Sequence, residues 1–389
     1  MAGRPLRIAY SFPFRLGSPG IGAAALSQIE ALRDAGLSVQ VFCWSSPKPI
    51  PGVSVFQTRR IVPLPQRVLG LRRACGLHDA IAATLARRWR GSFDVVHTWP
   101  LAAEQTLKAA RERGWLGVRE APNTHTANAF EVVAKEHAAL GVPQEKGNSH
   151  TFRQDVLARE LREYEAADLI LAPSDLAIET FVRRGVARRK LALKSYGFDP
   201  RTYRSHAGER DRSTVTFSFV ARCEPRKGLH HALEAWRRSG VADRSRFEVT
   251  GRFAPGYRQR LGALLEHENI TVREFAADLR PVYERADVLV LPSVEDGSAL
   301  VTYEAQASGC ALLVSDAAGA RFTDGIEGLQ HAAGDVETLA RQMRALVEDP
   351  ERLLGMQKAA ADNAQRYTWR RATDDLVEAY RAALLARTP

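Results

Sequence analysis

The sequence has 389 residues, of which 45% are hydrophobic and 26% are charged, and this composition is typical of a globular protein with room for two domains. No stretch approaches the ~18 consecutive apolar residues of a membrane span. Arginines and prolines interrupt the first residues, which excludes the apolar region of a secretory signal. Four scattered cysteines show neither metal-binding nor disulfide spacing. We therefore predict a cytoplasmic protein.

The net charge of +10 indicates an anionic partner, which could be a nucleic acid, a phosphorylated substrate or a membrane surface. Basic residues cluster over 67–90 and again over 183–190. Neither cluster contains the interleaved aromatic residues of a single-strand binder, and no zinc-finger spacing occurs, so we predict no nucleic-acid partner. The clusters are interpreted as solvated helix faces, or else as a surface for peripheral contact with the inner face of an anionic membrane.

Short apolar runs rich in β-branched residues alternate with longer helical patterns along the chain, which is typical of parallel α/β layers. A helical pattern over 23–36 ends at Gly36, a residue type that commonly stops helices. The predicted strands of the first half are 7–12, 38–44, 94–99, 116–121 and 168–174, and those of the second half are 214–221, 246–251, 270–275, 286–293 and 310–315.

Residues 196–214 are charged and rich in turn formers, without periodicity, and we predict that they link two domains. The expected architecture is α/β, with two doubly wound, Rossmann-like domains over 1–197 and 198–368. A final apolar-periodic helix within 369–389 has no strand after it and is expected to pack back on the first domain. Ligands of such sheets bind beyond the carboxyl ends of the strands, so the chemistry is expected in the loops that follow them.

The loop after the first strand contains Gly20 and Gly22 directly before a helix. Such a turn lets backbone N–H groups approach an anion, although a plain strand-to-helix turn is an equal alternative. The third glycine and the ribose-binding acid of a dinucleotide fingerprint are absent, so nicotinamide binding is not favoured.

Two histidines lie near the ends of predicted strands of the first half: His97 is within the end of 94–99, and His125 follows 116–121. A single histidine is more often a structural residue than a ligand, but two at strand ends of one sheet favour a cleft, where neutral imidazole can bind hydroxyl groups.

In the second half, Arg222, Arg226 and Lys227 lie between a strand and a helix. Cations at this position suit a diphosphate, and a solvated basic loop is the alternative.

The stretch PSVEDGSALVTYEAQASG (292–309) places three carboxylates around an expected helix with Ser298 as its N-cap and Gly309 as its stop. Glu304 is then roughly 9 Å along the helix from its N-terminus, a distance similar to the span of a nucleotide diphosphate. With the phosphates near the amides of 297–300, one carboxylate could reach the sugar while Glu304 reaches the ribose.

At these residues the chain resembles glycosyltransferase family 4, whose members are retaining enzymes of the GT-B fold that use nucleotide-activated sugars. The strongest match is EDGSALVTYEAQASGCALLVSD, followed by ARCEPRKG, ELREYEAADLILAPS and YGFDPRTY, and the matches run from the first strand to the last helix. The resemblance implies diphosphate contacts at Arg222 and Lys227 and a ribose contact at Glu304. It also places the turn from Gly20 to Gly22 in the cleft, with no metal and no bound cofactor.

The chain departs from the family pattern at two places. The first glutamate of the family corresponds to Asp296, so either this shorter carboxylate or Glu295 takes its role. The glycine-rich turn after it reads Gly297, Ser298 and Ala299, followed by Leu300. Where many relatives have a second histidine this chain has Trp99, so the contact to the sugar falls on either His97 or His125.

The resemblance implies transfer of a sugar, with retention, from a nucleoside diphosphate donor to an acceptor hydroxyl of a glycan, a lipid-linked compound or a small molecule. No residue is nominated as a covalent nucleophile, which favours front-face substitution with Arg222 and Lys227 stabilising the leaving group and Asp296 orienting the sugar. The alternative is a catalytically weak nucleotide-sugar-binding or membrane-surface adaptor protein on the same scaffold.

Overall fold

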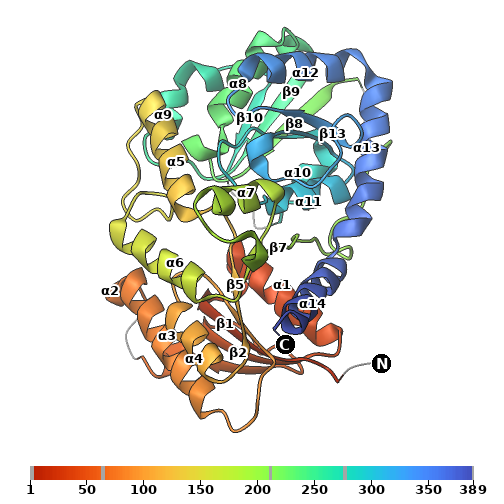
Figure 1. The fold of residues 1–389 in the computed structure, drawn as a ribbon. Helices are drawn as coiled ribbons and strands as arrows, with labels where there is room; N and C mark the ends of the chain where they lie inside the picture. The colour runs from red at the N-terminus through yellow and green to blue at the C-terminus, as the bar shows by residue number, and fades with distance from the viewer. Residues whose placement is uncertain (1–3, 63–65, 210–212, 275–277, 388–389) are drawn as a thin grey trace.

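The computed structural model describes residues 4–62, 66–209, 213–274 and 278–387, which form two separate sheets (Figure 1). The first sheet has seven strands in the order β3-β2-β1-β4-β5-β6-β7, and the second has six in the order β10-β9-β8-β11-β12-β13. Every described pairing is parallel. The predicted fold class of two doubly wound α/β sheets is thereby confirmed.

The strands of the first sheet occupy the first half of the chain. They are β1 (Arg7–Arg15), β2 (Ser38–Ser45), β3 (Ser54–Gln57), β4 (Val95–Thr98), β5 (Leu116–Glu120), β6 (Leu169–Ala172) and β7 (Leu191–Leu193). The strands of the second sheet are β8 (Val215–Val220), β9 (Ser245–Thr250), β10 (Ile270–Arg273), β11 (Val288–Leu291), β12 (Ala311–Ser315) and β13 (Gly328–His331). The predicted domain division after residue 197 lies between β7 and β8. Two predictions fall partly outside the described residues: the link, at 210–212, and the strand 270–275, at residue 275.

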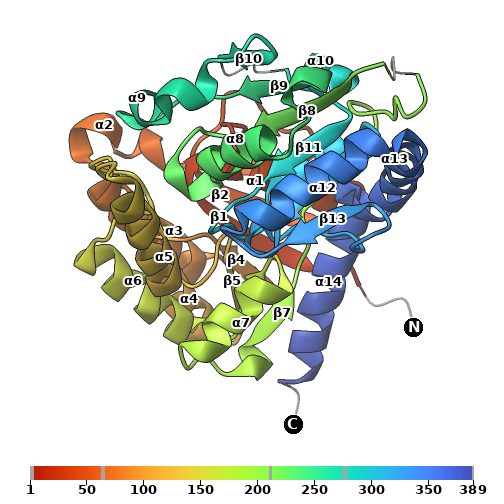
Figure 2. The same ribbon diagram turned by 90° about the horizontal axis from the view of Figure 1, so that it is seen from above.

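Helices separate most successive strands, as is usual for parallel pairing, but no α-helix lies in the fully described stretches between β2 and β3 or between β12 and β13. Those of the first half are α1 (Ile21–Asp34), α2 (Gln66–Leu69), α3 (Leu71–Arg88), α4 (Glu104–Glu112), α5 (Thr126–Leu140), α6 (Gln154–Ala166) and α7 (Asp175–Arg183). Those of the second half are α8 (Leu229–Arg238), α9 (Tyr257–Leu261), α10 (Arg280–Arg285), α11 (Leu300–Ala307), α12 (Val336–Glu348), α13 (Pro350–Ala364) and α14 (Trp369–Leu385). Seen from above, α8 and α12 lie side by side on one face of the second sheet (Figure 2).

The chain crosses between the two sheets twice, and the two crossings are bonded to each other. Phe198 pairs with Thr368 in an isolated parallel bridge. The amide of Phe198 donates to the carbonyl of Tyr367 (3.0 Å), and the amide of Trp369 donates to the carbonyl of Phe198 (3.1 Å). After the second crossing, α14 packs beside α1 on the first sheet (Figure 1).

The core of the first sheet includes residues from both ends of the sequence. Leu376 and Tyr380 of α14 are fully buried in the same cluster as Ile8 and Tyr10 of β1. A separate, larger cluster fills both faces of the second sheet. All four cysteines are buried and form no disulfide with one another. Among the described residues, no helix combines the length and the apolar character of a membrane span.

Candidate active site

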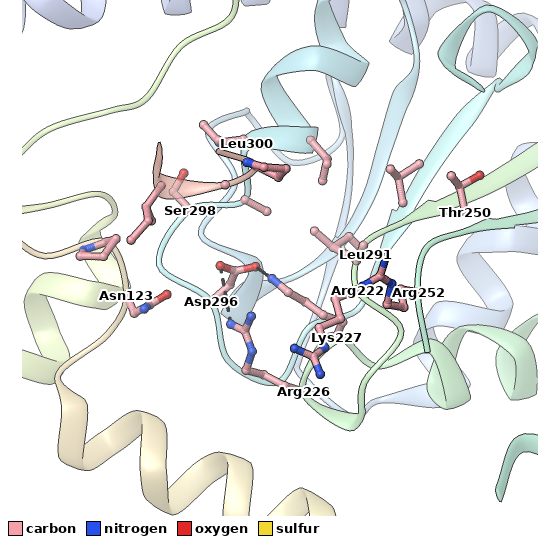
Figure 3. A pocket seen from close by; sticks show the side chains of 18 of the residues that line it. Asn123, Arg222, Arg226, Lys227, Thr250, Arg252, Leu291, Asp296, Ser298 and Leu300 are labelled. Carbon is pink, nitrogen blue, oxygen red and sulfur yellow. Dashed lines mark hydrogen bonds and ion pairs between the residues drawn. The ribbon is translucent and has the colours of Figure 1, made fainter. Parts of the chain in front are cut away.

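A cavity of about 930 Å³, here called the donor cavity, lies between the two sheets. Its wall from the first half includes Gly20 and Asn123, and its wall from the second half includes Arg222, Lys227 and Asp296. Arg222 and Lys227 follow the carboxyl end of β8, and Asp296 follows that of β11. Open parallel sheets bind their ligands beyond these strand ends. Figure 3 shows Asn123 across the cavity from Asp296.

Four cations border the donor cavity, and three of them lie in the loop after β8. Arg226 and Lys227 lie in a 3-10 turn that Gly228 ends with a φ of +72°. A Cβ atom on Gly228 would lie 2.0 Å from the carbonyl oxygen of Pro292, so only glycine lets this turn approach the loop after β11. The bordering cations are Arg222, Arg226, Lys227 and Arg252.

Carboxylates hold these cations in place. Lys227 forms an ion pair with Asp296, and the Arg226 guanidinium contacts Glu224 at 3.0 Å and Glu295 at 3.1 Å. Burial, together with the neighbouring Arg226 charge, lowers the pKa of Lys227, and Asp296 opposes that shift. Burial alone would lower the pKa of Arg226, but its carboxylate neighbours raise it above the ordinary value. A diphosphate in the cavity would therefore find two oriented cations.

The two candidate carboxylates after β11 have different positions. Asp296 lines the donor cavity beside Lys227, and it also accepts from the amide of Gly297 (3.0 Å). Glu295 is 1% exposed and accepts from the Thr124 hydroxyl at 2.7 Å as well as from Arg226. Asp296 is therefore the carboxylate that faces the donor cavity, and Glu295 is buried beside it, where it fixes Arg226 and Thr124.

The glycine after Asp296 forms one of the contacts between the two halves of the molecule. A Cβ atom on Gly297 would lie 2.0 Å from the carbonyl oxygen of Pro122. The Gly297 carbonyl accepts from the hydroxyl of Ser174, at the start of α7, at 2.7 Å. Glycine at this position therefore permits the close approach of the two walls.

The start of α11 differs from the prediction at Ser298. Ser298, Ala299 and Leu300 all line the donor cavity, but α11 begins at Leu300 with Ala299 as its N-cap. The Ser298 hydroxyl instead bonds the Tyr303 hydroxyl at 2.8 Å, so the predicted capping role is wrong. The helix stop is as predicted, because Gly309 has a φ of +73° just after the last turn.

Glu304 lies one turn beyond the part of α11 that borders the donor cavity. The cavity is lined by Leu300 and Val301, and Glu304 itself is partly buried. Its Oε2 accepts from the Tyr283 hydroxyl at 3.0 Å. Burial raises the pKa of Glu304, and the bond from Tyr283 opposes the shift. The ribose contact that the resemblance implies remains a prediction, which the adjacent cavity wall favours.

His97 occupies the core of the first sheet and borders neither the donor cavity nor the second cavity described below. Its Nδ1 lies 2.7 Å from the Tyr380 hydroxyl, its Nε2 lies 3.4 Å from Glu120, and its ring stacks on Tyr10. Burial lowers the pKa of His97 to about 4, which keeps the ring neutral. Its position therefore does not support the predicted contact to the sugar.

His125 also borders neither cavity. It is the N-cap of α5, where its Nδ1 accepts from the amide of Ala127 (3.2 Å), and its ring packs against Tyr164 and Phe181. Burial lowers the pKa of His125 to about 4.

Of the two predicted glycines, Gly20 borders the donor cavity and Gly22 does not. A Cβ atom on Gly22 would lie 2.8 Å from the carbonyl of Arg15, so its role is to let α1 start close to β1.

A second cavity of about 450 Å³, here called the acceptor cavity, adjoins the first. The two share Ile21, Pro122, Asn123 and Arg226 as lining residues. Most of the remaining wall comes from the first half of the chain and includes polar residues that sequence reasoning did not single out. These are Thr124, Thr126, Asn148, His150 and Arg153.

The segment between α5 and α6 joins the acceptor cavity to the cation loop after β8. Glu145 pairs with Arg222, Asn148 donates to Glu224 at 3.1 Å, and His150 lies 3.7 Å from Glu295. Burial and the Arg226 charge lower the pKa of His150 to about 3, so its ring is neutral. No motif in this segment indicates these contacts.

Two family models cover most of the chain. Residues 20–201 match the model described as Glycosyltransferase Family 4, and residues 214–349 match the one described as Glycosyl transferases group 1. The chain belongs to glycosyltransferase family 4. The predicted family and its transferase function are thereby confirmed.

Curated relatives of this family-4 glycosyltransferase match over nearly its whole length. The D-inositol 3-phosphate glycosyltransferase of Nocardia farcinica is 26% identical, over 98% of this chain and 90% of the relative. The enzyme of the same name from Geodermatophilus obscurus is 29% identical, over 95% of this chain and 87% of the relative.

Solved structures share the fold of this family-4 glycosyltransferase. Anabaena HepE in complex with UDP and glucose has a TM-score of 0.64 at 17% identity, with 97% of this chain and all of that one covered. Sucrose-phosphate synthase from Thermosynechococcus elongatus has a TM-score of 0.72 at 18% identity, with 98% and 100% covered. The two facing sheets of the chain therefore have the GT-B arrangement.

Proposed function

We propose that this family-4 glycosyltransferase moves a sugar, with retention, from a nucleoside diphosphate donor in the donor cavity to a hydroxyl in the acceptor cavity. The observation behind this proposal is the cation loop after β8, whose three cations border the donor cavity, each in an ion pair with a different carboxylate. They are Arg222, Arg226 and Lys227. Charge-assisted contacts of this kind suit a diphosphate. A UDP-sugar is the first donor to test, since HepE was solved with UDP-glucose.

The proposed step is a front-face substitution. The acceptor oxygen bonds to the anomeric carbon on the face from which the diphosphate leaves, the bond from that carbon to the phosphate oxygen breaks, and the departing oxygen takes the acceptor proton. Arg222 and Lys227, together with Arg226, stabilise the charge that develops on the leaving diphosphate, so this proposal needs no metal there. Asp296 orients the sugar, and the donor enters as a substrate rather than a resident cofactor.

The acceptor cavity suits a compound with several hydroxyl groups. Thr124, Thr126, Asn123 and the neutral His150 offer hydrogen-bond donors and acceptors without a net charge. The curated relatives are named for D-inositol 3-phosphate, which makes a phosphorylated cyclitol the first small acceptor to test, beside glycan and lipid-linked acceptors.

Replacing Glu304 with alanine is expected to raise the KM for the donor about tenfold or more, since a lost hydrogen bond to a charged group costs roughly 1.5–3 kcal/mol. The change in kcat should be smaller, because the ribose is remote from the breaking bond. A panel of UDP-, GDP- and dTDP-sugars, screened by thermal shift, identifies the donor. Initial-rate kinetics with that donor then compare the KM and kcat of the wild type with those of Glu304→Ala.

Glu348→Ala is the matched control, because Glu348 is half exposed on α12 in the second domain. It should leave the donor KM unchanged. An unchanged KM in Glu304→Ala would contradict the ribose contact. Specific donor binding without transfer or hydrolysis of any sugar would instead favour a catalytically weak binding protein.

Peripheral contact with an anionic membrane surface is part of the proposal, and a patch on the first domain supports it. The exposed hydrophobic residues Ile61, Val68 and Leu71 lie on three neighbouring elements, the turn at Thr58–Arg60, α2 and the start of α3. Apolar side chains flanked by cations are typical of membrane-surface segments. The exposed arginines of the patch are Arg59, Arg60, Arg72 and Arg73.

Sedimentation with vesicles tests this patch. The protein is expected to bind vesicles that contain anionic phosphatidylglycerol, less at high salt, and not to bind neutral phosphatidylcholine vesicles. Arg72→Glu with Arg73→Glu should abolish that binding, whereas Arg341→Glu with Arg352→Glu, at exposed positions of the second domain, should preserve it. Equal sedimentation of both double variants would contradict a role of the patch.

A further inference from the structure

Three potential metal ligands from the two halves of the molecule meet away from both cavities. Glu136 lies on α5, and His230 and His231 lie on the first turn of α8. The Nε2 atom of each histidine is 2.8 Å from Oε1 of Glu136, and the three ligand atoms all lie within 4.8 Å of one another. None of the three residues lines the donor or the acceptor cavity.

Two imidazole nitrogens and a carboxylate oxygen suit a divalent transition metal such as Zn²⁺. Each ring contacts Glu136 through Nε2, the atom that would bind the ion. Because a metal ligand must be deprotonated, binding requires the tautomer of each ring that carries its proton on Nδ1.

The geometry needs only a small adjustment to admit an ion. Bond lengths of about 2.0–2.1 Å in a tetrahedral site separate ligand atoms by about 3.3 Å. This is roughly half an ångström more than the two contacts to Glu136 and less than the 4.8 Å within which all three atoms lie. The side chains of Glu136 and His231 are each 17% exposed, which provides a path for the ion and room for water as further ligands.

A hydrogen bond on the far side of one ring fixes its orientation. The Tyr257 hydroxyl lies 2.7 Å from Nδ1 of His230, and it also accepts from the backbone amide of His230 at 3.1 Å. The ring therefore presents its Nε2 atom to Glu136. Metal-bound histidines commonly have a hydrogen-bond partner of this kind at their second nitrogen.

We propose that Glu136, His230 and His231 bind one divalent transition metal ion of the Zn²⁺ type, and that the ion ties α5 of the first domain to α8 of the second. α5 begins two residues after Thr124, which lines the acceptor cavity, and α8 begins two residues after Lys227, which lines the donor cavity. A bound ion would thus hold the two walls of the active site together. It would not contact the substrates of the proposed reaction.

The test uses the full-length chain, freed of any histidine tag and stripped of metal with a chelator. Competition with a chromophoric chelator measures Zn²⁺ binding, and visible absorption with Co²⁺ reports the coordination geometry. The wild-type protein is expected to bind one ion per chain. Glu136→Gln and His231→Gln should each weaken binding at least tenfold, although both side chains keep their capacity for hydrogen bonds. His267→Gln, outside the cluster, should leave binding unchanged.

A second readout keeps the test independent of activity and of folding defects. Zn²⁺ should raise the Tm of the wild type by a few degrees, because a ligand that binds only the folded state stabilises it, and should leave the Tm of Glu136→Gln unchanged. Tyr257→Phe, which leaves all three ligands in place, should weaken Zn²⁺ binding about tenfold. Absence of stoichiometric binding by the wild type, or equal affinity in the Glu136 and His231 variants, would overturn the proposal and leave a purely hydrogen-bonded contact.

Discussion

Replacing Lys227 with alanine is expected to lower kcat about 100- to 1000-fold, the usual effect of removing one group that stabilises charge in the transition state. Lys227 lines the donor cavity and is held by Asp296, so its ammonium group is in place before the donor arrives. Steady-state kinetics with the donor found by the thermal-shift panel measure the effect. Affinity for the free nucleoside diphosphate should also fall, because the leaving group and the product bind the same cation.

Lys108→Ala is the matched control for Lys227→Ala. Lys108 is exposed on α4, where it pairs with Glu104, so its loss should leave kcat unchanged. Lys227→Arg should retain part of the activity, because it keeps the charge but changes its shape. A kcat within about threefold of the wild type in Lys227→Ala would contradict the proposed role of the cation loop.

Replacing Arg119 with leucine is expected to lower the free energy of unfolding by about 3–5 kcal/mol, because it leaves two buried carboxylates without their cation. The Arg119 side chain is 1% exposed, contacts Glu160 and Glu163 at 3.1 Å each, and lies over the ring of Tyr164. Denaturant unfolding followed by circular dichroism measures the loss. Arg162→Leu is the control, since Arg162 pairs with Glu104 at the surface and should cost less than about 1 kcal/mol.

The Arg119→Leu defect should depend on pH. Burial raises the pKa of Glu160 and Glu163 in the folded protein, and Arg119 opposes that shift. Without Arg119 the folded state holds more protons than the unfolded state above the ordinary glutamate pKa, so stability must fall as pH rises. The difference from the wild type is therefore expected to be larger at pH 8 than at pH 5. A difference that does not change with pH would contradict this account.

The sequence predicted the central strands well because buried parallel strands are nearly continuous apolar runs. It missed β3, β13 and β7, all of which lie at sheet edges. Their sequences are SVFQ, GLQH and LAL, which are too short or too polar for periodicity to show.

The position of a candidate site residue could be predicted where one strand end determines it. Arg222, Lys227 and Asp296 follow β8 and β11 directly, so topology alone brings them to one edge. His97 also belongs to a strand end, but its ring turns to Tyr380, a residue 283 positions later, and such a contact leaves no local pattern. His150 was missed for the same reason, because its neighbours in the second domain are set by the approach of the two sheets.

The packing of α14 sets an order of events during synthesis. Residues 7–196 supply every strand of the first sheet, yet Leu376 and Tyr380 fill part of its core. While the second domain is still being made on the ribosome, the nascent first sheet has an apolar face that lacks this cover. Aggregation or chaperone binding of the unfinished chain should therefore centre on the surface that α1 and β1 later present to α14, until the last helix emerges from the exit tunnel.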